Sequence, residues 1–446
     1  MMAGIDSKPV NQPRLTVWAG AQRVGDVIFQ KPGTCQLHYD QSWQQQGFSL
    51  SPHLPFDQPC RALATTNFIR NLFPEGGAFE TLLATEHLSK NNLYGILATI
   101  GADTAGALTF AQEQVQQQSE SALRQVNQYE IIERLRHNRS LAVWDDKYRL
   151  SLAGVQNKLN VLCRADGSLY LADGQYASTH ILKFASEQYP SIVLNEYYCM
   201  RLARAVGLPT AEVEIQHFGV YPALLVKRFD RQVTEHKVAK RHVIDGCQAL
   251  NMSPDYKYEQ NFGSGRDVAA IRDGVSIKKL YQFLAITSVP ALARQQLIDW
   301  VLFNIIIGNS DAHGKNVSFY YGKEGPRLTP FYDMVSVGFE ALQNDSLDTS
   351  LAMAIGDNFN QDQLTAYDLL SMADELGINF DYLKRRINRL TGLVDNHCGT
   401  LELAAETLNE AEQQKLVELV DFVAERNQAL RAQIAEFNVV IKTAFE

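Results

Sequence analysis

Residues 308–316 read GNSDAHGKN and residues 328–333 read LTPFYD, two polar stretches that follow a mostly apolar run at 302–307. The apolar run is typical of a buried helix. A rigid helix that ends in a polar loop is a common way to present functional side chains. We therefore look for an active site here.

Three residues of these stretches have the spacing of a phosphoryl-transfer site. Asp311 and Asn316 form D-x-x-x-x-N, and Asp333 follows seventeen residues after Asn316. Transfer from ATP needs a carboxylate near the acceptor hydroxyl, and an amide and a second carboxylate that hold Mg²⁺. A hairpin predicted for 317–328 would bring Asp333 back beside Asn316. Taken alone, D-x-x-x-x-N is also typical of an Asx-rich turn that caps a helix.

A lysine and a glutamate upstream support the same interpretation. Lys183 lies on a predicted strand, 180–184, among apolar neighbours, where a lysine requires an anionic partner. Glu196 lies on the next predicted helix, 191–206, on the stripe expected to face the core. In kinases such a pair positions the ATP phosphates. The pair would also fit a purely structural salt bridge.

The turn at 151–158, SLAGVQNK, precedes the strand lysine, where a kinase has its phosphate-covering loop. It is not G-x-G-x-x-G, because only Gly154 relaxes the backbone, and alone it would be interpreted as a hairpin turn. The order of elements is nevertheless that of a kinase: loop, lysine, glutamate, D-x-x-x-x-N, aspartate. Order and spacing together favour phosphoryl transfer.

Composition limits the class of protein. The 446 residues are 46% hydrophobic, which predicts two or three domains with sizeable cores and excludes a mostly disordered chain. With 41 basic and 50 acidic residues, the net charge of −9 disfavours strong DNA binding by the chain alone, although a local basic patch would be compatible with it. The six cysteines lack zinc-ligand spacing. No apolar signal core or membrane-length run is present, so we expect a cytoplasmic protein without a membrane contact.

Pattern changes divide the chain into four segments. Strand patterns and a helical stretch at 65–97 predict a β-rich N-terminal domain at 1–115, and a glutamine-rich, polar stretch predicts a linker or helix at 116–147. Short strands and one helix predict a sheet-rich lobe at 148–250. The remainder, 251–446, is predicted to be helical apart from the segment after 316.

These motifs give the chain a specific resemblance to the HipA family, the serine/threonine-kinase toxins of bacterial toxin–antitoxin pairs. The resemblance is carried by residues 151–158 (SLAGVQNK), 179–183 (THILK), 195–199 (NEYYC), 226–231 (VKRFDR), 311–316 (DAHGKN) and 328–333 (LTPFYD). It implies an α+β fold, with a two-lobed protein-kinase-like core similar to those of HipA and the phosphoinositide kinases. A small β-rich N-terminal domain and an all-helical C-terminal lobe would complete the fold.

The resemblance also implies roles for individual residues. Asp311 would be the catalytic aspartate, Asn316 and Asp333 would ligate Mg²⁺, and Glu196 would form the ion pair with Lys183. Ser151 would be the site of inactivating autophosphorylation. The residues expected to bind ATP are Ala153, Gly154, Val155, Gln156, Asn157, Lys158, Lys183, Ile244, Asp245, Gly246, His313, Lys315, Asn316, Tyr332 and Asp333. Among these, Ile244–Gly246 would be the hinge that binds adenine, and we assign His313 no role in proton transfer.

The implied activity is that of an ATP- and Mg²⁺-dependent, non-specific serine/threonine protein kinase that causes growth arrest. An aminoacyl-tRNA synthetase would be its substrate. A HipB-like helix-turn-helix antitoxin would be its partner, would supply most contacts to the DNA operator, and would repress transcription together with it.

Two alternatives stay open at this point. Asp311-x-His313-x-x-Asn316 also resembles the D-x-H-x-x-N motif of phosphoinositide kinases, and small-molecule phosphotransferases use a related aspartate. Alternatively, the chain would be a pseudokinase that binds ATP and acts only as a co-repressor.

Overall fold

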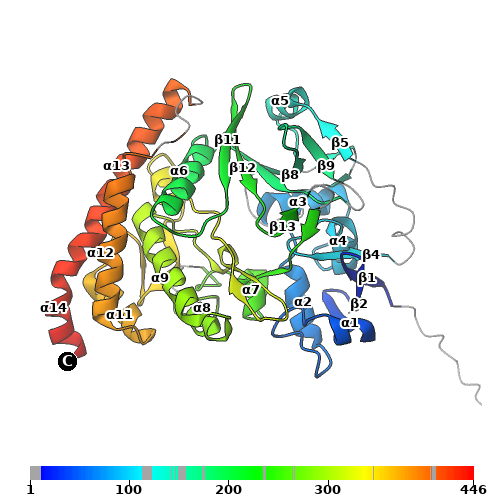
Figure 1. Cartoon of the computed structure of the whole chain (residues 1–446), viewed down its shortest axis with the longest axis horizontal. Helices are drawn as coiled ribbons and strands as arrows, with labels where there is room; N and C mark the ends of the chain where they lie inside the picture. The colour runs from blue at the N-terminus through cyan, green and yellow to red at the C-terminus, as the bar shows by residue number, and fades with distance from the viewer. Residues whose placement is uncertain are drawn as a thin grey trace, which may run out of the picture.

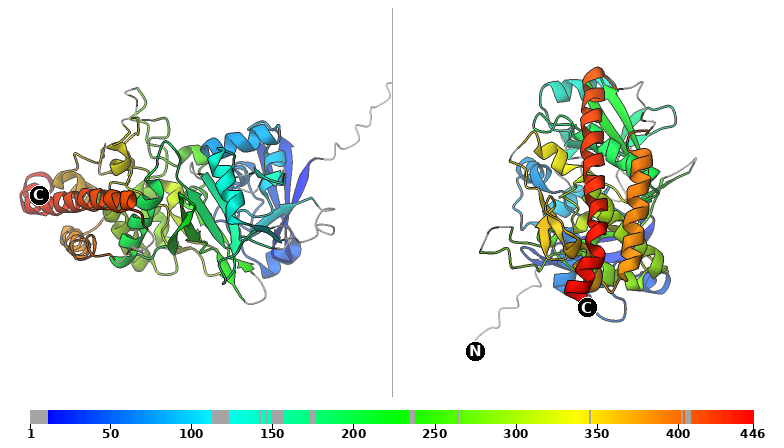
Figure 2. Two further views of the ribbon diagram at one scale, coloured as in Figure 1. Left: turned by 90° about the horizontal axis from the view of Figure 1, so that it is seen from above. Right: turned by 90° about the vertical axis from the view of Figure 1, so that its left-hand side faces the viewer.

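The computed structural model describes residues 12–446 except 113–122, 142, 146, 149–156, 173–175, 235–237, 264, 266, 345, 402 and 404–407. Figures 1 and 2 show an N-terminal domain at one end of the molecule, a sheet-rich lobe beside it and a helical lobe at the other end. This arrangement confirms the predicted α+β class.

The N-terminal domain is an antiparallel sheet of order β3-β2-β1-β4 packed against short helices. Side chains such as Leu15, Val27 and Ile96 form its core. The predicted helical stretch is divided into three helices, because Pro74 cannot continue a helix and Asn92 caps a new one. The elements are β1 (Arg14–Ala19), β2 (Gln22–Lys31), β3 (Thr34–Tyr39), α1 (Gln41–Gln46), α2 (Ala62–Arg70), α3 (Gly76–Thr85), α4 (Leu93–Ile100) and β4 (Leu108–Ala111).

The second part is a six-stranded sheet of order β11-β12-β10-β8-β9-β5 with a helix on each face. Leu159 and Leu182 face α5, whereas their neighbours Lys158 and Lys183 face α6, because side chains alternate along a strand. The elements are β5 (Leu123–Val126), α5 (Gln128–Arg136), β6 (Val143–Trp144), β7 (Lys147–Tyr148), β8 (Asn157–Cys163), β9 (Leu169–Ala172), β10 (His180–Phe184), α6 (Ile192–Ala205), β11 (Val213–Phe218) and β12 (Tyr221–Lys227).

The segment interpreted as a linker or helix contains more structure than its composition suggests. Strand β5 pairs with β9 at the edge of the lobe sheet, and Ile131 of α5 is buried against the same sheet. The capping box of Asn127 and Glu130 begins α5. From residue 123 the chain therefore already belongs to the sheet-rich lobe, and the helical part of the prediction is limited to α5.

Short strands connect the two lobes. The hairpin predicted after Asn316 is present as β16 and β17, and β15 joins it as a third strand. Bounds in this region are β13 (Arg231–Val233), β14 (Val238–Lys240), β15 (Val243–Asp245), α7 (Gly246–Ala249), η1 (Pro254–Tyr256), η3 (Gly314–Asn316), β16 (Ser318–Tyr320) and β17 (Arg327–Leu328).

The third part is mostly helical, with one addition to the prediction: β18 and β19 form a hairpin beyond the motif region. Helices α12 and α13 run side by side along the far edge of the molecule (Figure 2). The elements are α8 (Ile277–Phe283), η2 (Leu284–Ile286), α9 (Pro290–Ile307), α10 (Val337–Ala341), β18 (Ser350–Ile355), β19 (Asn358–Asn360), α11 (Ala366–Glu375), α12 (Phe380–His397), α13 (Glu410–Ala432), η5 (Gln433–Glu436), α14 (Phe437–Val440) and η6 (Ile441–Phe445).

Helix α9 is the buried helix predicted before the polar loop. Its residues from Leu297 to Ile307 are all buried, and it ends at Gly308, whose φ of 68° lies in the left-handed region that glycine adopts without strain. Asn304, the polar residue that interrupts the apolar run, accepts a hydrogen bond from the side chain of Asn309 at 2.8 Å. The helix therefore anchors the loop that it delivers.

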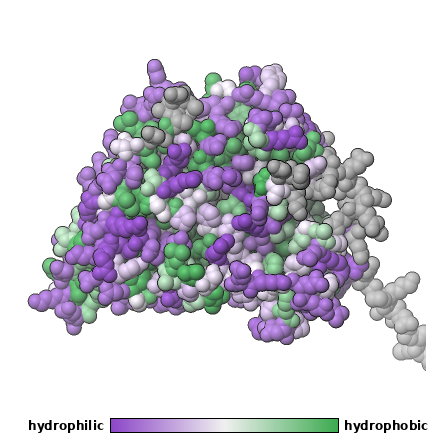
Figure 3. Space-filling model, viewed as in Figure 1, coloured by the Kyte–Doolittle hydropathy of each residue, from purple (hydrophilic) through white to green (hydrophobic). Residues whose placement is uncertain are grey.

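Figure 3 shows a face on which hydrophilic residues predominate and hydrophobic ones are scattered. Among the helices of the described residues, none combines the length and the apolar character needed to cross a membrane.

Candidate active site

A cavity of about 930 Å³ lies where the three parts of the molecule meet. Its walls include strand β10, helix α6, the loop after α9 and the segment after β17. It brings together ten of the predicted site residues: Lys158, Lys183, Glu196, Asp245, Asp311, His313, Lys315, Asn316, Tyr332 and Asp333. Apolar walls with a few convergent charged groups are typical of a small-molecule site.

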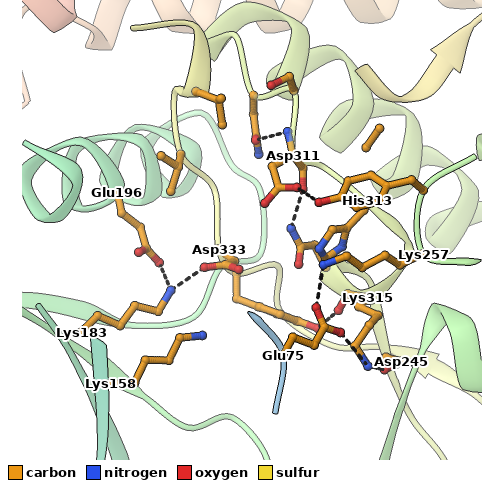
Figure 4. A pocket seen from close by; sticks show the side chains of 18 of the residues that line it. Glu75, Lys158, Lys183, Glu196, Asp245, Lys257, Asp311, His313, Lys315 and Asp333 are labelled. Carbon is orange, nitrogen blue, oxygen red and sulfur yellow. Dashed lines mark hydrogen bonds and ion pairs between the residues drawn. The ribbon is translucent and has the colours of Figure 1, made fainter. Parts of the chain in front are cut away.

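Lys183 links two carboxylates at one side of this cavity (Figure 4). Its Nζ donates hydrogen bonds of 2.5 Å to Oε1 of Glu196 and 2.5 Å to Oδ1 of Asp333. Burial alone would lower the pKa of Lys183, but Asp333 and Glu196 outweigh it and raise that pKa above its usual value. Burial would raise the pKa of Asp333, but Lys183 and Lys158 hold it far below its usual range. The lysine is a cation and Asp333 an anion at neutral pH.

Lys158 is the partner of Lys183 across strands β8 and β10, and both side chains are buried. Burial, and then the positive charge of Lys183, lower the pKa of Lys158 to about 8. Two amino groups on one wall of a cavity form a binding site for an anion with several charges, such as a polyphosphate.

Asp311 is exposed to the cavity at the end of the loop that α9 anchors. Its backbone N–H donates to Oδ1 of Asn309 at 3.1 Å, and its carbonyl oxygen accepts from Nδ2 of Asn316 at 2.9 Å. Since the amide nitrogen of Asn316 is used in this way, its carbonyl oxygen is the atom suited to a cation. His313 between them is buried, and burial lowers the pKa of its imidazole, so the ring is neutral near pH 7.

Asp333 adopts a backbone conformation that few residues other than glycine adopt. Its φ is 58°, in the left-handed region, where aspartate and asparagine are tolerated. The preceding Tyr332 is held by its hydroxyl, which donates to the carbonyl oxygen of Lys315 at 2.6 Å. Such strain at a charged cavity residue is typical of functional sites.

Asp333 and Asn316 suit Mg²⁺ as a pair of oxygen ligands. Among the described residues there is no group of three or more His, Cys, Asp or Glu side chains that would hold a metal by themselves. Mg²⁺ usually takes one or two carboxylates together with water and substrate phosphates. The residues therefore fit a magnesium ion that arrives with a phosphate substrate.

Lys315 lies in the cavity wall but is engaged by the protein itself. Its Nζ donates to Oδ2 of Asp245 at 2.6 Å, and to the backbone oxygen and Oδ1 of Asn71 at 2.9 and 3.0 Å. An ammonium group has three hydrogen atoms to donate, and all three are taken here. Lys315 therefore joins the N-terminal domain to the helical lobe, and the predicted contact with ATP would require one of these bonds to break.

Residues 244–246, the predicted adenine hinge, also make contacts within the protein where contacts with adenine were expected. Ile244 is fully buried and pairs with Phe319 in the β15–β16 ladder, and the N–H of Gly246 donates to the carbonyl oxygen of Val317. Of the three residues only Asp245 lines the cavity. This geometry argues against adenine at residues 244–246, because the backbone groups that would bind it are already paired.

The end of β12 presents a better surface for a flat ring. Ile181 and Val226, opposite each other on β10 and β12, line the cavity, as do Lys227, Arg228 and Phe229 after the strand. We did not single out this segment for binding, although it lies within one of the motifs quoted above. Its signal in the sequence was an apolar strand that ends in Lys227 and Arg228 and is followed by the aromatic Phe229.

The N-terminal domain contributes residues that sequence analysis missed entirely. Glu75, at the start of α3, lines the cavity, and its Oε2 accepts from Nζ of Lys257 at 2.6 Å. Burial would raise the pKa of Glu75, but Lys315 and Lys257 lower it overall. No local spacing in the sequence indicates Glu75, because Lys257, to which it is bonded, is 182 residues away in the chain.

Tyr258 is a further residue that we had not predicted. Its hydroxyl donates a 2.6 Å hydrogen bond to Oδ1 of Asp311. The remaining predicted residues of the phosphate loop, Ser151 and Ala153–Gln156, lie outside the described residues. Asn157 begins strand β8.

Comparison with protein families now settles the family. A model described as the HipA N-terminal domain matches residues 15–111, and a model described as the HipA-like C-terminal domain matches residues 150–398, more than half of the chain. The chain belongs to the HipA family.

Individual HipA proteins and their relatives match over nearly the whole length. The serine/threonine-protein kinase toxin HipA of Shewanella oneidensis is 39% identical over 403 residues, which are 89% of this chain and 91% of that protein. Putative kinase Y4mE of Sinorhizobium fredii is 30% identical over 438 residues, 94% of this chain and 99% of that protein. A solved structure of Shewanella oneidensis HipA with HipB and operator DNA superposes with a TM-score of 0.85 at 36% identity, covering 96% of this chain and 99% of that one. The kinase-like fold inferred from the motifs is thereby confirmed.

Proposed function

We propose that this HipA-family chain is a serine/threonine protein kinase that transfers the γ-phosphoryl group of ATP to a protein hydroxyl. The observation that carries the proposal is the position of Lys183, which bonds to both Glu196 and Asp333 in the same cavity as Asp311. This arrangement matches the parts that phosphoryl transfer requires.

The cavity offers a place for each part of ATP. Lys183 and Lys158 would contact the phosphates, together with the segment 153–157. The adenine ring would lie against Ile181 and Val226, with its polar edge toward residues 227–229. Bound Mg²⁺, held by Asp333 and Asn316, would offset the negative charge of the phosphates.

Asp311 would act on the acceptor. Its carboxylate lies on the opposite side of the cavity from Lys183 in Figure 4, and it is exposed. There it would orient the hydroxyl of a serine or threonine and accept the proton as the oxygen attacks the γ-phosphorus. Neutral His313 would brace the loop.

The biological role that we propose is that of a toxin in a toxin–antitoxin pair. Support comes from the names of the relatives and from the solved complex of a similar protein with HipB and operator DNA. The partner would be a helix-turn-helix antitoxin that carries most of the operator contacts and represses transcription jointly. The substrate would be an aminoacyl-tRNA synthetase, and phosphorylation of Ser151 would inactivate the kinase.

The test is intact mass followed by phosphopeptide mapping after incubation of the purified chain with ATP and Mg²⁺. We expect one added phosphate on Ser151, and none in Asp311→Asn. Asp421→Asn, the same substitution on the exposed side of α13, is the control and should behave as the parent does. Phosphate added to Asp311→Asn would contradict the role of Asp311. Binding of ATP without any transfer to protein would instead direct the work to small-molecule acceptors and to a pseudokinase.

A further inference from the structure

We propose that Tyr258 occupies the acceptor position on Asp311 and thereby suppresses hydrolysis of ATP until a protein hydroxyl takes its place. This inference rests on the proposed kinase activity and adds a specificity device to it. Tyr258 belongs to none of the motifs that identify the family.

The first observation is the contact itself. The hydroxyl of Tyr258 donates to Oδ1 of Asp311 at 2.6 Å, and both residues line the cavity. An acceptor serine or threonine must present its hydroxyl to the same carboxylate in order to lose its proton there. The tyrosine therefore makes the hydrogen bond that a substrate would make. Burial first, and then Asp311, raise the pKa of Tyr258, so its hydroxyl remains a donor.

The second observation is how the backbone around Tyr258 is anchored. The two residues beside it are anchored to different parts of the molecule. Lys257 is bonded to Glu75 of the N-terminal domain, and the backbone N–H of Glu259 donates to the carbonyl oxygen of Ala352 on β18 at 2.9 Å. The backbone of Tyr258 is thus held from both sides.

The side chain, in contrast, is held by contacts that are easily exchanged. Its ring lies edge-on against His313, with centroids 5.2 Å apart, and 37% of the residue is exposed. Rotation about the side-chain bonds would free Asp311 without disturbing the backbone. An arriving protein segment needs to exchange one hydrogen bond and two ring contacts, the one with His313 and the one with Nζ of Lys257, which lies 5.0 Å from the ring centroid.

The chemical reason for such a device is competition from water. If water reached Asp311, its oxygen would bond to the γ-phosphorus while the bond to the β,γ-bridging oxygen breaks. ADP would leave and the proton of the water would pass to Asp311. A hydroxyl already bonded to Oδ1 of Asp311 competes with that water for this oxygen. A protein substrate displaces it because its many contacts compensate for the lost bond, whereas a single water has none to offer.

The test compares Tyr258→Phe with the parent. Phenylalanine removes the hydroxyl and keeps the ring against His313. Tyr256→Phe is the matched control. It also removes one tyrosine hydroxyl, but Tyr256 is two positions before Tyr258 in the chain and does not line the cavity. With ATP and Mg²⁺, one measures free phosphate and protein-bound phosphate from the same reaction, using the Asp311→Asn chain as the added protein acceptor. Thermal unfolding verifies that each variant is folded.

We expect the ratio of free to protein-bound phosphate to rise about tenfold in Tyr258→Phe, which corresponds to the loss of one hydrogen bond to a charged group. The Tyr256→Phe ratio should equal that of the parent. A simple structural role for Tyr258 would lower both products together and leave the ratio unchanged, and that result would overturn the proposal. Phosphate found on Tyr258 itself would also overturn it, because the residue would then be an acceptor.

Two further outcomes are separable. If the parent phosphorylates protein but Tyr258→Phe leaves the ratio of free to protein-bound phosphate unaltered, the proposed role of Tyr258 is wrong and the kinase assignment stands. If the parent neither hydrolyses nor transfers phosphate, both are wrong. Should the phenylalanine variant fail to fold, Tyr258→Met fills the space with a flexible side chain and carries the same expectation.

Discussion

Nζ of Lys183 lies 2.5 Å from Oδ1 of Asp333, although the two residues are 150 positions apart in the chain. The same amino group bonds to Glu196, so one cation serves two carboxylates. Without nucleotide, Lys183 and Asp333 neutralise each other. When Mg²⁺ and ATP bind, Asp333 can turn to the metal and Lys183 to the phosphates, while the pair with Glu196 remains.

This geometry predicts that substitutions of Lys183 and of Asp333 have unequal effects on the free energy of unfolding. Lys183→Met leaves Glu196, which is buried, without its cation, and should lower the free energy of unfolding by about 3–5 kcal/mol and abolish ATP binding. Asp333→Asn keeps the Lys183–Glu196 pair, so it should remain folded and lose only the metal-dependent part of ATP binding. Urea unfolding and calorimetric titration of ATP with and without Mg²⁺ check both. Equal loss of stability in the two variants would contradict the expectation.

Lys158 predicts a pH dependence of ATP binding. Because its pKa is lowered to about 8, it loses its charge as the pH rises through that value, and bound phosphates favour the charged form. ATP affinity should therefore fall by up to about tenfold per pH unit above pH 8. Lys158→Arg, which stays protonated, should bind ATP with a flatter profile up to pH 9.5 or so. Identical profiles for the two proteins would show that another group is responsible.

The contacts of buried Lys315 predict that this charged side chain stabilises the attachment of the N-terminal domain to the rest of the molecule. Lys315→Met leaves Asp245 without its 2.6 Å partner and frees both oxygens of Asn71, so the free energy of unfolding should fall by about 3–5 kcal/mol. Lys323→Met, the same change at an exposed position, should have little effect and serves as the control. Thermal unfolding of both variants measures the difference, and similar midpoints would refute the role of Lys315.

His242 predicts a loss of stability in weak acid. Its ring is buried between Phe48 and Phe68 of the N-terminal domain, and Nε2 lies 2.8 Å from the carbonyl oxygen of Leu50. Burial lowers its pKa to about 4, so the unfolded chain takes up this proton below pH 6.5 and the folded chain does not until about pH 4. The free energy of unfolding should therefore decrease by about 3 kcal/mol as the pH falls through this window.

The measurement is urea unfolding of the parent and of His242→Gln between pH 7 and pH 4. The variant should lack this part of the decrease, whereas His38→Gln, at an exposed position of β3, should retain it. A variant as acid-sensitive as the parent would assign the effect to other groups.

Short-range patterns were sufficient for much of the site. The apolar neighbours of Lys183 marked it as a lysine that needs an anionic partner, and the apolar run of α9 located the loop with Asp311. The spacing of Asp311, Asn316 and Asp333 predicted their meeting in one cavity, because a hairpin must return the chain to its starting point. The same patterns did not show that the predicted adenine hinge, 244–246, would be paired with β16, since nothing local in the sequence indicates this pairing.

The sequence by itself thus determined the class of fold, the family and the order of the chemical groups, because each depends on residues that are close in the chain and repeat with the period of a helix or strand. Apart from the Lys183–Glu196 pair, which the sequence predicted, only the tertiary structure decided which polar groups of the site bond to one another. Glu75 with Lys257, Lys315 with Asn71, and Tyr258 with Asp311 are contacts between segments far apart in the chain. Such pairs follow from the packing of whole domains, and a side chain's partner across a domain boundary has no periodicity by which it could be recognised.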